Sequence, residues 1–102
     1  MQIKNSEILF PNGLKPIKVE RLHYTNITLN SNGYLGYVVN TPAGYTLFDC
    51  VINDYDYGPG VCGTGTNTGV DKIYIYGDAN KVIADIRLSV IYVKTELIEV
   101  LT

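Results

Sequence analysis

The segment from Lys81 to Lys94 constrains the fold of this chain more than any other part of the sequence. It reads KVIADIRLSVIYVK, and an apolar residue occupies every second position from Val82 to Tyr92. Alternation with a period of two is typical of a β-strand with one buried face. Read as a helix, the same stretch would scatter its apolar side chains around the whole circumference. The set expected to be buried is Val82, Ala84, Ile86, Leu88, Val90 and Tyr92.

The opposite face of this strand carries Asp85, Arg87 and Ser89, but then Ile91 and Val93. This change predicts that the end of the strand is covered on both sides, for example by another subunit.

A second β-rich alternation, KIYIY, lies just upstream at Lys72–Tyr76. The link between the two segments is Gly-Asp-Ala-Asn, made mostly of residues that tolerate turn geometry. We therefore predict that the two segments pair as an antiparallel hairpin.

Four further strands are predicted upstream, with turn-forming residues between them. They cover Ile17–Leu22, Tyr24–Leu29, Tyr34–Val39 and Tyr45–Asn53. Turn signals at this spacing are typical of a sandwich or barrel, and the connections are too short for parallel crossovers. The expected fold is all-β, an antiparallel, jelly-roll-like β-sandwich of about six to eight strands.

The length of 102 residues fits one domain. We assign residues 16–102 to the β-sandwich domain and residues 1–15 to an N-terminal connector or edge strand. Residues 54–71 read DYDYGPGVCGTGTNTGVD and are expected to form a long loop, of the kind that binds ligands or moves. The tail at residues 95–102, TELIEVLT, is a further strand or a subunit contact.

Charge and hydropathy exclude several classes of protein. The formal net charge is −2, and the eight Lys and Arg residues are scattered, so nucleic acid is not an expected partner. No segment has the apolar length of a signal peptide core or of a membrane span, so we expect a soluble chain without membrane insertion. The two cysteines allow one disulfide and require none: Cys50 fits a buried free thiol, and Cys62 lies in the Gly-rich segment.

Catalytic groups are sparse. The single histidine, His23, lies in an alternating segment, and nothing near it in the sequence supports a pair with Cys50 or Cys62. Asp54 and Asp56 lie two positions apart, but two acids in one turn do not by themselves flank a substrate bond. We therefore expect a protein that is not an enzyme.

Metal and cofactor motifs are incomplete. Asn53, Asp54, Asp56 and Gly58 form an oxygen-rich turn that suits Ca²⁺, but the distant Glu of a calcium loop is absent. The cysteines and the histidine have no zinc spacing. The Gly-rich stretch lacks the Lys and the helix of a phosphate loop. No metal and no cofactor are expected.

Recognition remains. Five of the nine tyrosines lie in or beside turns, with Asn and Asp between them: Tyr34, Tyr37, Tyr45, Tyr55 and Tyr57. Such side chains suit the apolar faces and hydroxyls of sugars. The alternative is that these tyrosines pack in the sheets. The ligand-binding residues that we predict are Asn53, Tyr55, Asp56 and Tyr57.

Two runs, ITLNSNGYLGYVVNTPAGYTLFDCVI and DANKVIADIRLSVIYVK, resemble C-terminal head domains of bacteriophage tail fibres and receptor-binding proteins. The shared layout is a strand, a Gly-containing turn, a second strand, a Pro-x-Gly-Tyr corner and a third apolar strand, with a closing strand that ends in x-Tyr-x-Lys. The resemblance covers Ile17–Lys94, and the tail beyond Lys94 departs from it.

The resemblance implies a homotrimeric β-sandwich head on the surface of a virion, in contact with other virion proteins, that attaches to a host cell-surface glycan or protein. It transfers no binding residues by position. Two other functions stay open: a structural virion protein, such as a capsid decoration or tail component, and a carbohydrate-binding module.

Overall fold

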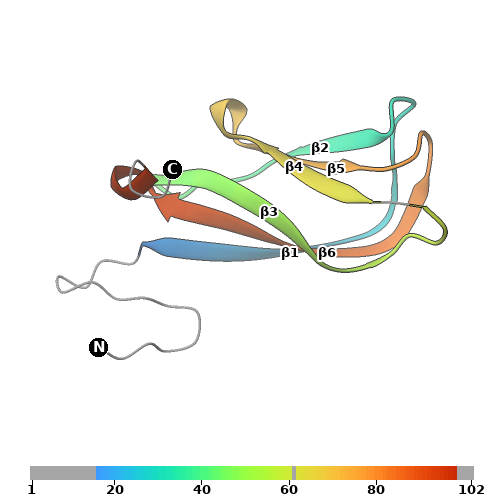
Figure 1. Ribbon diagram of the computed structural model, residues 1–102, viewed down its shortest axis with the longest axis horizontal. Helices are drawn as coiled ribbons and strands as arrows, with labels where there is room; N and C mark the ends of the chain where they lie inside the picture. Colours follow the sequence, from blue (N-terminus) through green and yellow to red (C-terminus); the bar gives the residue numbers. More distant parts are fainter. Residues whose placement is uncertain (1–15, 61, 99–102) are drawn as a thin grey trace.

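The computed structural model describes residues 16–60 and 62–98, which form two antiparallel sheets of three strands stacked as two layers (Figure 1). In the first sheet the order is β1 (Ile17–Thr28), β6 (Val82–Lys94) and β3 (Tyr45–Asp56). In the second sheet it is β2 (Tyr34–Val38), β5 (Lys72–Tyr76) and β4 (Gly63–Asn67). Two short 3₁₀ turns follow β4 and β6: η1 (Thr68–Val70) and η2 (Thr95–Leu97). The predicted all-β, antiparallel fold class is confirmed.

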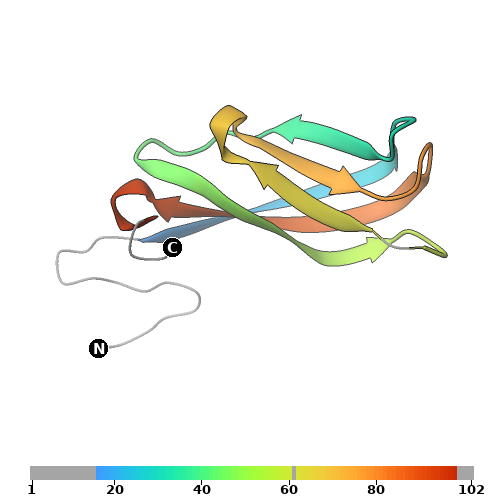
Figure 2. The same cartoon turned by 45° about the horizontal axis from the view of Figure 1, so that its top comes forward.

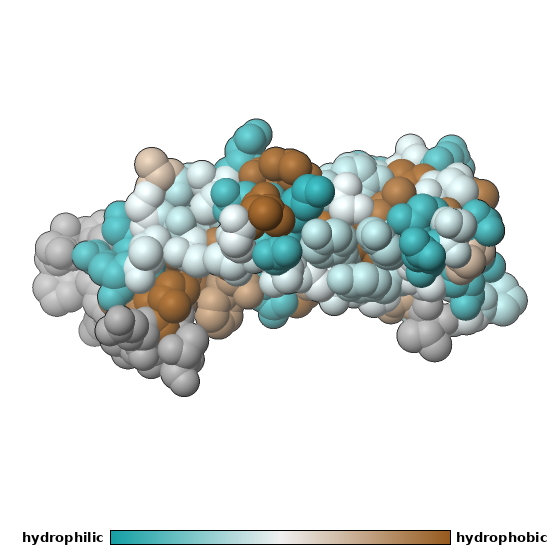
Figure 3. All heavy atoms as spheres, turned by 90° about the horizontal axis from the view of Figure 1, so that it is seen from above, coloured by the Kyte–Doolittle hydropathy of each residue, from teal (hydrophilic) through white to brown (hydrophobic). Residues whose placement is uncertain are grey.

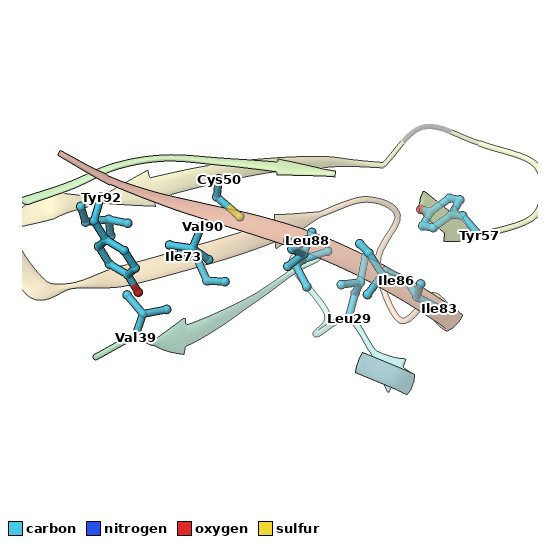
Figure 4. Close-up of a cluster of buried hydrophobic side chains, with 12 residues drawn as sticks. Leu29, Val39, Cys50, Tyr57, Ile73, Ile83, Ile86, Leu88, Val90 and Tyr92 are labelled. Carbon is cyan, nitrogen blue, oxygen red and sulfur yellow. The ribbon is translucent and has the colours of Figure 1, made fainter. Parts of the chain in front are cut away.

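The core lies between the two central strands. Ile73 and Ile75 of β5 are fully buried, as are Ile86, Leu88 and Val90 of β6, and they belong to one hydrophobic cluster (Figure 4). Each side chain of this kind contributes about 1.5–3 kcal/mol when it is removed from water. Successive side chains of a β-strand point to opposite faces of the sheet, so burial of these residues turns their neighbours on each strand outward.

The long strand predicted near the C-terminal end is β6, but the buried set changes along it. Ile86, Leu88, Val90 and Tyr92 are buried as predicted, whereas Val82 and Ala84 are exposed and Ile83 is buried. The first residues of β6 bend toward the second sheet (Figure 1), which turns Ile83 into the core. At the other end Val93 is 1% exposed, so this chain alone covers it.

The predicted hairpin between Lys72–Tyr76 and the long strand is wrong. β5 pairs with β2 and β4, while β6 pairs with β1 and β3, so residues 77–81 cross from one sheet to the other (Figure 2). Turn-forming residues permit a sharp change of direction, but they do not distinguish a hairpin from an arch between sheets. Among the described strands, only β4 and β5 are consecutive in sequence and neighbours in one sheet.

Several predicted boundaries differ from the structure. The strands predicted at Ile17–Leu22 and Tyr24–Leu29 are one continuous strand, β1, in which Asn26 has a positive φ of 50°. β2 agrees with the prediction apart from its last residue, and β3 continues to Asp56 with two irregularities in its pairing to β6. The tail begins with the turn η2, and residues 1–15 and 99–102 lie outside the described residues.

The expected long loop at residues 54–71 contains the end of β3, the strand β4 and the turn η1. β4 reads GTGTN, and its inward positions are threonines. The Thr64 hydroxyl donates a hydrogen bond to the carbonyl of Cys50 at 2.7 Å, which links the edges of the two sheets. The Thr68 hydroxyl donates likewise to the carbonyl of Leu47 at 2.9 Å. The sequence prediction missed this strand because polar threonines replace the usual apolar alternation.

Both cysteines are free thiols. Cys50 is buried as expected, and this burial raises the pKa of its thiol to about 11. Cys62 is half-buried, which also raises its pKa. Within the described part of the chain, no helix has the length and apolar character of a membrane span.

At one end of the sandwich, hydrogen bonds join the connection between β1 and β2 to the connection between β5 and β6. The side chain of Asn30 accepts hydrogen bonds from the backbone N–H groups of Asn32 and Tyr34, and its carbonyl accepts one from Asn80. Gly33 has a φ of +82°, and its carbonyl accepts the N–H of Gly77 at 2.8 Å. A Cβ at Gly33 would lie 2.5 Å from the carbonyl oxygen of Gly77, so only glycine fits there without displacement.

Tyr57 closes the same end. Its ring is 4% exposed, its hydroxyl donates to the carboxylate of Asp78 at 2.9 Å, and the N–H of Asp78 donates back to that hydroxyl at 2.6 Å. The ammonium of Lys81 lies 4.9 Å from the ring centroid. Burial raises the pKa of the Tyr57 hydroxyl. Tyr57 is therefore a core residue, and its hydrogen bonds to Asp78 hold the connection between β5 and β6 in place.

We predict that Gly33→Ala lowers the free energy of unfolding by about 2–4 kcal/mol. The left-handed backbone costs a side-chain-bearing residue about 1–2 kcal/mol, and relief of the contact with Gly77 costs about as much again. Urea unfolding followed by circular dichroism measures the change. Gly63→Ala is the control, because no heavy atom beyond its chain neighbours lies within 4 Å of its Cβ position, and it should change the stability by less than about 0.5 kcal/mol. Equal effects of the two variants would contradict the packing described for Gly33.

We also predict that Tyr57→Phe lowers the free energy of unfolding by about 1–3 kcal/mol, because it leaves a partly buried N–H of Asp78 without its acceptor. Tyr55→Phe, at an exposed tyrosine, should change the stability by less than about 0.5 kcal/mol. The same unfolding measurement compares them. A Tyr57→Phe variant as stable as the unaltered chain would show that this hydroxyl is not structural.

Candidate functional site

Three tyrosines gather on the outer surface of the second sheet. Tyr34 of β2 lies opposite Tyr76 of β5, and Tyr74 is two positions before Tyr76 on the same side of β5. Their outward direction follows from the burial of Ile73 and Ile75 on the other side of β5. We call this surface the tyrosine face; its residues are Tyr34, Tyr74, Tyr76, Gly36, Gly63 and Gly65.

The three rings form a compact triangle. The ring centroids of Tyr74 and Tyr76 are 6.0 Å apart with an interplanar angle of 25°, so these two rings form a nearly continuous platform. Tyr34 lies 6.1 Å from Tyr74 and 6.2 Å from Tyr76, at angles of 71° and 50°. The plane of the Tyr34 ring is therefore steeply inclined to the platform. A cluster of this size suits one or two sugar rings.

Glycines on the neighbouring strands support the platform. A Cβ at Gly36 would lie 2.9 Å from the ring of Tyr74, and one at Gly65 would lie 2.9 Å from the ring of Tyr76. The rings thus lie directly on the backbones of β2 and β4. Glycine weakens a strand by about 0.5–1 kcal/mol relative to alanine, and close approach of another group is a usual reason for its presence. With one side resting on backbone, the opposite side of each ring is turned toward solvent, and Tyr76 is 45% exposed.

The surroundings of the tyrosine face are almost uncharged. The remaining outward positions of the three strands are Val38, Lys72 and Asn67. Lys72 is the only charged residue among the outward positions of β2, β5 and β4. Figure 3 looks onto this side of the molecule, where pale surface is interrupted by separate hydrophobic and hydrophilic patches. A neutral surface with apolar rings and hydroxyls can stack on the C–H face of a sugar and bond its hydroxyls.

Other tyrosines serve the fold. Tyr24 of β1 stacks on Tyr37 of β2, with centroids 4.4 Å apart, and closes one edge between the sheets. Burial raises the pKa of both hydroxyls. The ring of Tyr45 has the ammonium of Lys18 at 4.7 Å and that of Lys94 at 4.9 Å. Tyr37 and Tyr45 thus pack within the sandwich, as the alternative to a recognition role predicted, whereas Tyr34 is 37% exposed on the tyrosine face.

The four ligand-binding residues predicted from the sequence do not form one accessible surface. Tyr57 is buried and its hydroxyl donates to Asp78, so its ring lies in the core and not on a surface. The amide oxygen of Asn53 accepts a hydrogen bond from Ser89 at 2.7 Å. Tyr55 is 46% exposed and Asp56 is exposed, both at the end of β3, in the other sheet from the tyrosine face. The sequence prediction considered Tyr34 but did not group it with Tyr74 and Tyr76, because it did not foresee that β2 and β5 are neighbours.

The groups considered for catalysis are separated by the first sheet. His23 lies on the outer side of β1, where it is hydrogen-bonded to Asp85 and opposite Arg87, while Cys50 points into the core. A Cys50–His23 pair is therefore excluded. The hydrogen bond from His23 lowers the pKa of Asp85. Asp54 bonds the N–H of Tyr55, and no group of three His, Cys, Asp or Glu side chains suited to a metal occurs in residues 16–60 and 62–98.

Comparison with known proteins adds no relative. The chain matches no protein-family model, no curated protein and no solved structure at a significant level.

Proposed function

We propose that this chain is a non-enzymatic binding domain whose tyrosine face binds a saccharide on a cell surface. The observation that supports this most directly is the platform of Tyr74 and Tyr76 on the backbones of Gly36 and Gly65. Strand glycines that allow two rings to lie flat and open to solvent have no evident benefit for the core.

Physical chemistry favours a sugar as the ligand of such a surface. Tyrosine rings offer a large apolar area with a polar hydroxyl at the edge, and rings already held in place lose little conformational entropy on binding. The tyrosine hydroxyls supply donors and acceptors for sugar hydroxyls. Because the backbones of β2 and β4 already hold the rings of Tyr74 and Tyr76 in place, the platform is preorganised for a ligand.

The resemblance to phage head domains suggests the setting. A domain at the end of a tail fibre attaches a virion to the host, and its ligand would be a host glycan or protein. The homotrimer, the neighbouring virion proteins and the location on the virion are parts of the same proposal.

We predict that Tyr76→Ala raises the dissociation constant for a bound glycan roughly tenfold, which corresponds to about 1.4 kcal/mol. A glycan array first identifies ligands, and retardation in native gels containing the selected polysaccharide compares the variants. Tyr55→Ala is the matched control, because Tyr55 and Tyr76 are almost equally exposed, at 46% and 45%, and lie in different sheets.

Loss of binding with Tyr55→Ala and not with Tyr76→Ala would place the site at the end of β3, as the sequence predicted. Absence of any retained glycan or host cell would contradict the proposed function. Unfolding curves of both variants check that neither loss reflects a change in stability.

A carbohydrate-binding module that accompanies an enzyme is the second candidate, and the same tyrosine face favours it. The two differ in context and not in the site. A catalytic domain encoded beside this chain would favour the module, whereas tail and lysis genes beside it would favour the phage head domain.

A further inference from the structure

The two rings of the platform are arranged across the strands and not along them. Pairing places Gly36 of β2, Tyr74 of β5 and Gly65 of β4 in one row across the sheet. The ring of Tyr74 lies over Gly36, because a Cβ there would be 2.9 Å from its Cε1 atom. The ring of Tyr76 lies over Gly65, where a Cβ would be 2.9 Å from its Cε2 atom and 3.4 Å from its hydroxyl. One ring therefore covers β2 and the other covers β4, both on this row.

The platform is open in the direction across the strands. β2 and β4 are the outer strands of the sheet, and on this row the outward residue of each is a glycine. In the direction along the strands, the ring of Tyr34 bounds one flank and is inclined to both platform rings. The other flank carries the side chains of the next row: Val38, Lys72 and Asn67. A long ligand therefore fits across the strands better than along them.

The platform offers two separate ring faces to such a ligand. The centroids of Tyr74 and Tyr76 are 6.0 Å apart, and the planes differ by 25°. This separation is comparable with the repeat of one pyranose unit in an extended chain of equatorially linked sugars. Successive units of the chain can therefore stack on the two rings. Tyr34 is 6.1 Å from one ring and 6.2 Å from the other, so it faces the junction between them, beside the linkage that would join the two units.

We propose that the ligand of the tyrosine face is an internal stretch of a linear polysaccharide with equatorially linked pyranose units. It crosses the sheet between β2 and β4, with two consecutive units on Tyr74 and Tyr76. This inference rests on the proposed saccharide-binding function and specifies the ligand. Because both ends of the platform reach an edge of the sheet, the polymer continues past it in both directions, and no chain end is required for binding.

A series of oligosaccharides of increasing length tests the number of units bound. The probes are glucose and N-acetylglucosamine oligomers of one to four units with β-1,4 linkages, and α-1,4-linked glucose oligomers, whose chain is curved. NMR titration measures each dissociation constant. From one to two β-linked units the affinity should rise roughly tenfold, because the second unit is tethered to the first and its contact costs no further translational freedom. The α-linked series should show a smaller rise.

The variant Gly65→Ala tests the platform with a small change in the strand. The backbone of Gly65 is not in the left-handed region, so alanine fits there, but its methyl group displaces the end of the Tyr76 ring. The dissociation constant of the β-linked tetramer should rise roughly tenfold, toward that of the single sugar. Gly69→Ala is the matched control, because Gly69 lies in η1, outside the tyrosine face, and the nearest atom to its Cβ position is 3.5 Å away. It should bind the tetramer as the unaltered chain does, and unfolding curves check that both variants are folded.

A nitroxide attached to the reducing end of the β-linked tetramer tests the direction of the chain. It should broaden the amide signals of an outer strand, near Gly36 of β2 or near Gly65 of β4. Broadening centred on Lys72, or on the connection that follows Tyr76, would show that the chain lies along β5 and would overturn the crossing arrangement.

The outcomes separate this inference from the proposed function. Equal affinity for one and for several β-linked units, or a Gly65→Ala variant that binds the tetramer unchanged, would overturn the two-unit platform and leave saccharide binding intact. A glycan array that identifies a ligand while no β-linked oligomer binds would overturn it as well. An array without any retained glycan would contradict saccharide binding itself.

Discussion

Contact between two central strands, each the middle of its own sheet, holds this sandwich together. Ile73 and Ile75 of β5 and Ile86, Leu88 and Val90 of β6 are fully buried within one cluster. Because side chains alternate along a strand, this buried layer also decides what the molecule shows to solvent. Tyr74 and Tyr76 are turned to one outer side, and Arg87 and Ile91 to the other. The core thus specifies which side chains reach each outer surface, including those of the tyrosine face.

The sequence predicted the strands that have an apolar alternation and missed the one that lacks it. β6 and β5 could be recognised because apolar residues recur at every second position. β4 could not, since its inward residues are the polar Thr64 and Thr66. The partner of the Thr64 hydroxyl, the carbonyl of Cys50, comes within reach only in the folded chain. The pairing of β5 with β2 was equally hidden: the residues at 77–81 form a good turn, and a turn does not reveal whether the chain remains in one sheet or crosses to the other.

The candidate site depends on the pairing of β5 with β2 and β4, and for that reason it could not be predicted from the sequence. Their position near a turn favoured Tyr55 and Tyr57 as ligand-binding residues, yet Tyr57 is a core residue. The useful signal was the glycines in strands, Gly36 and Gly65, which are costly unless another group approaches closely. Only the register Gly36–Tyr74–Gly65 across three strands shows which groups approach, and that register joins segments far apart in the chain.

The order of the strands has a consequence for how the chain is made. β6 lies between β1 and β3, yet it is the last of the described strands to leave the ribosome. Its partners in β1 lie 54 positions away at Thr28 and Val82 and 76 positions away at Ile17 and Val93. Closing such long loops is slow compared with forming a hairpin. The growing chain therefore carries two long strands whose shared neighbour does not yet exist. During that interval only the small unit of β4 and β5 can form by local pairing, and the first sheet assembles in one late step around its middle strand.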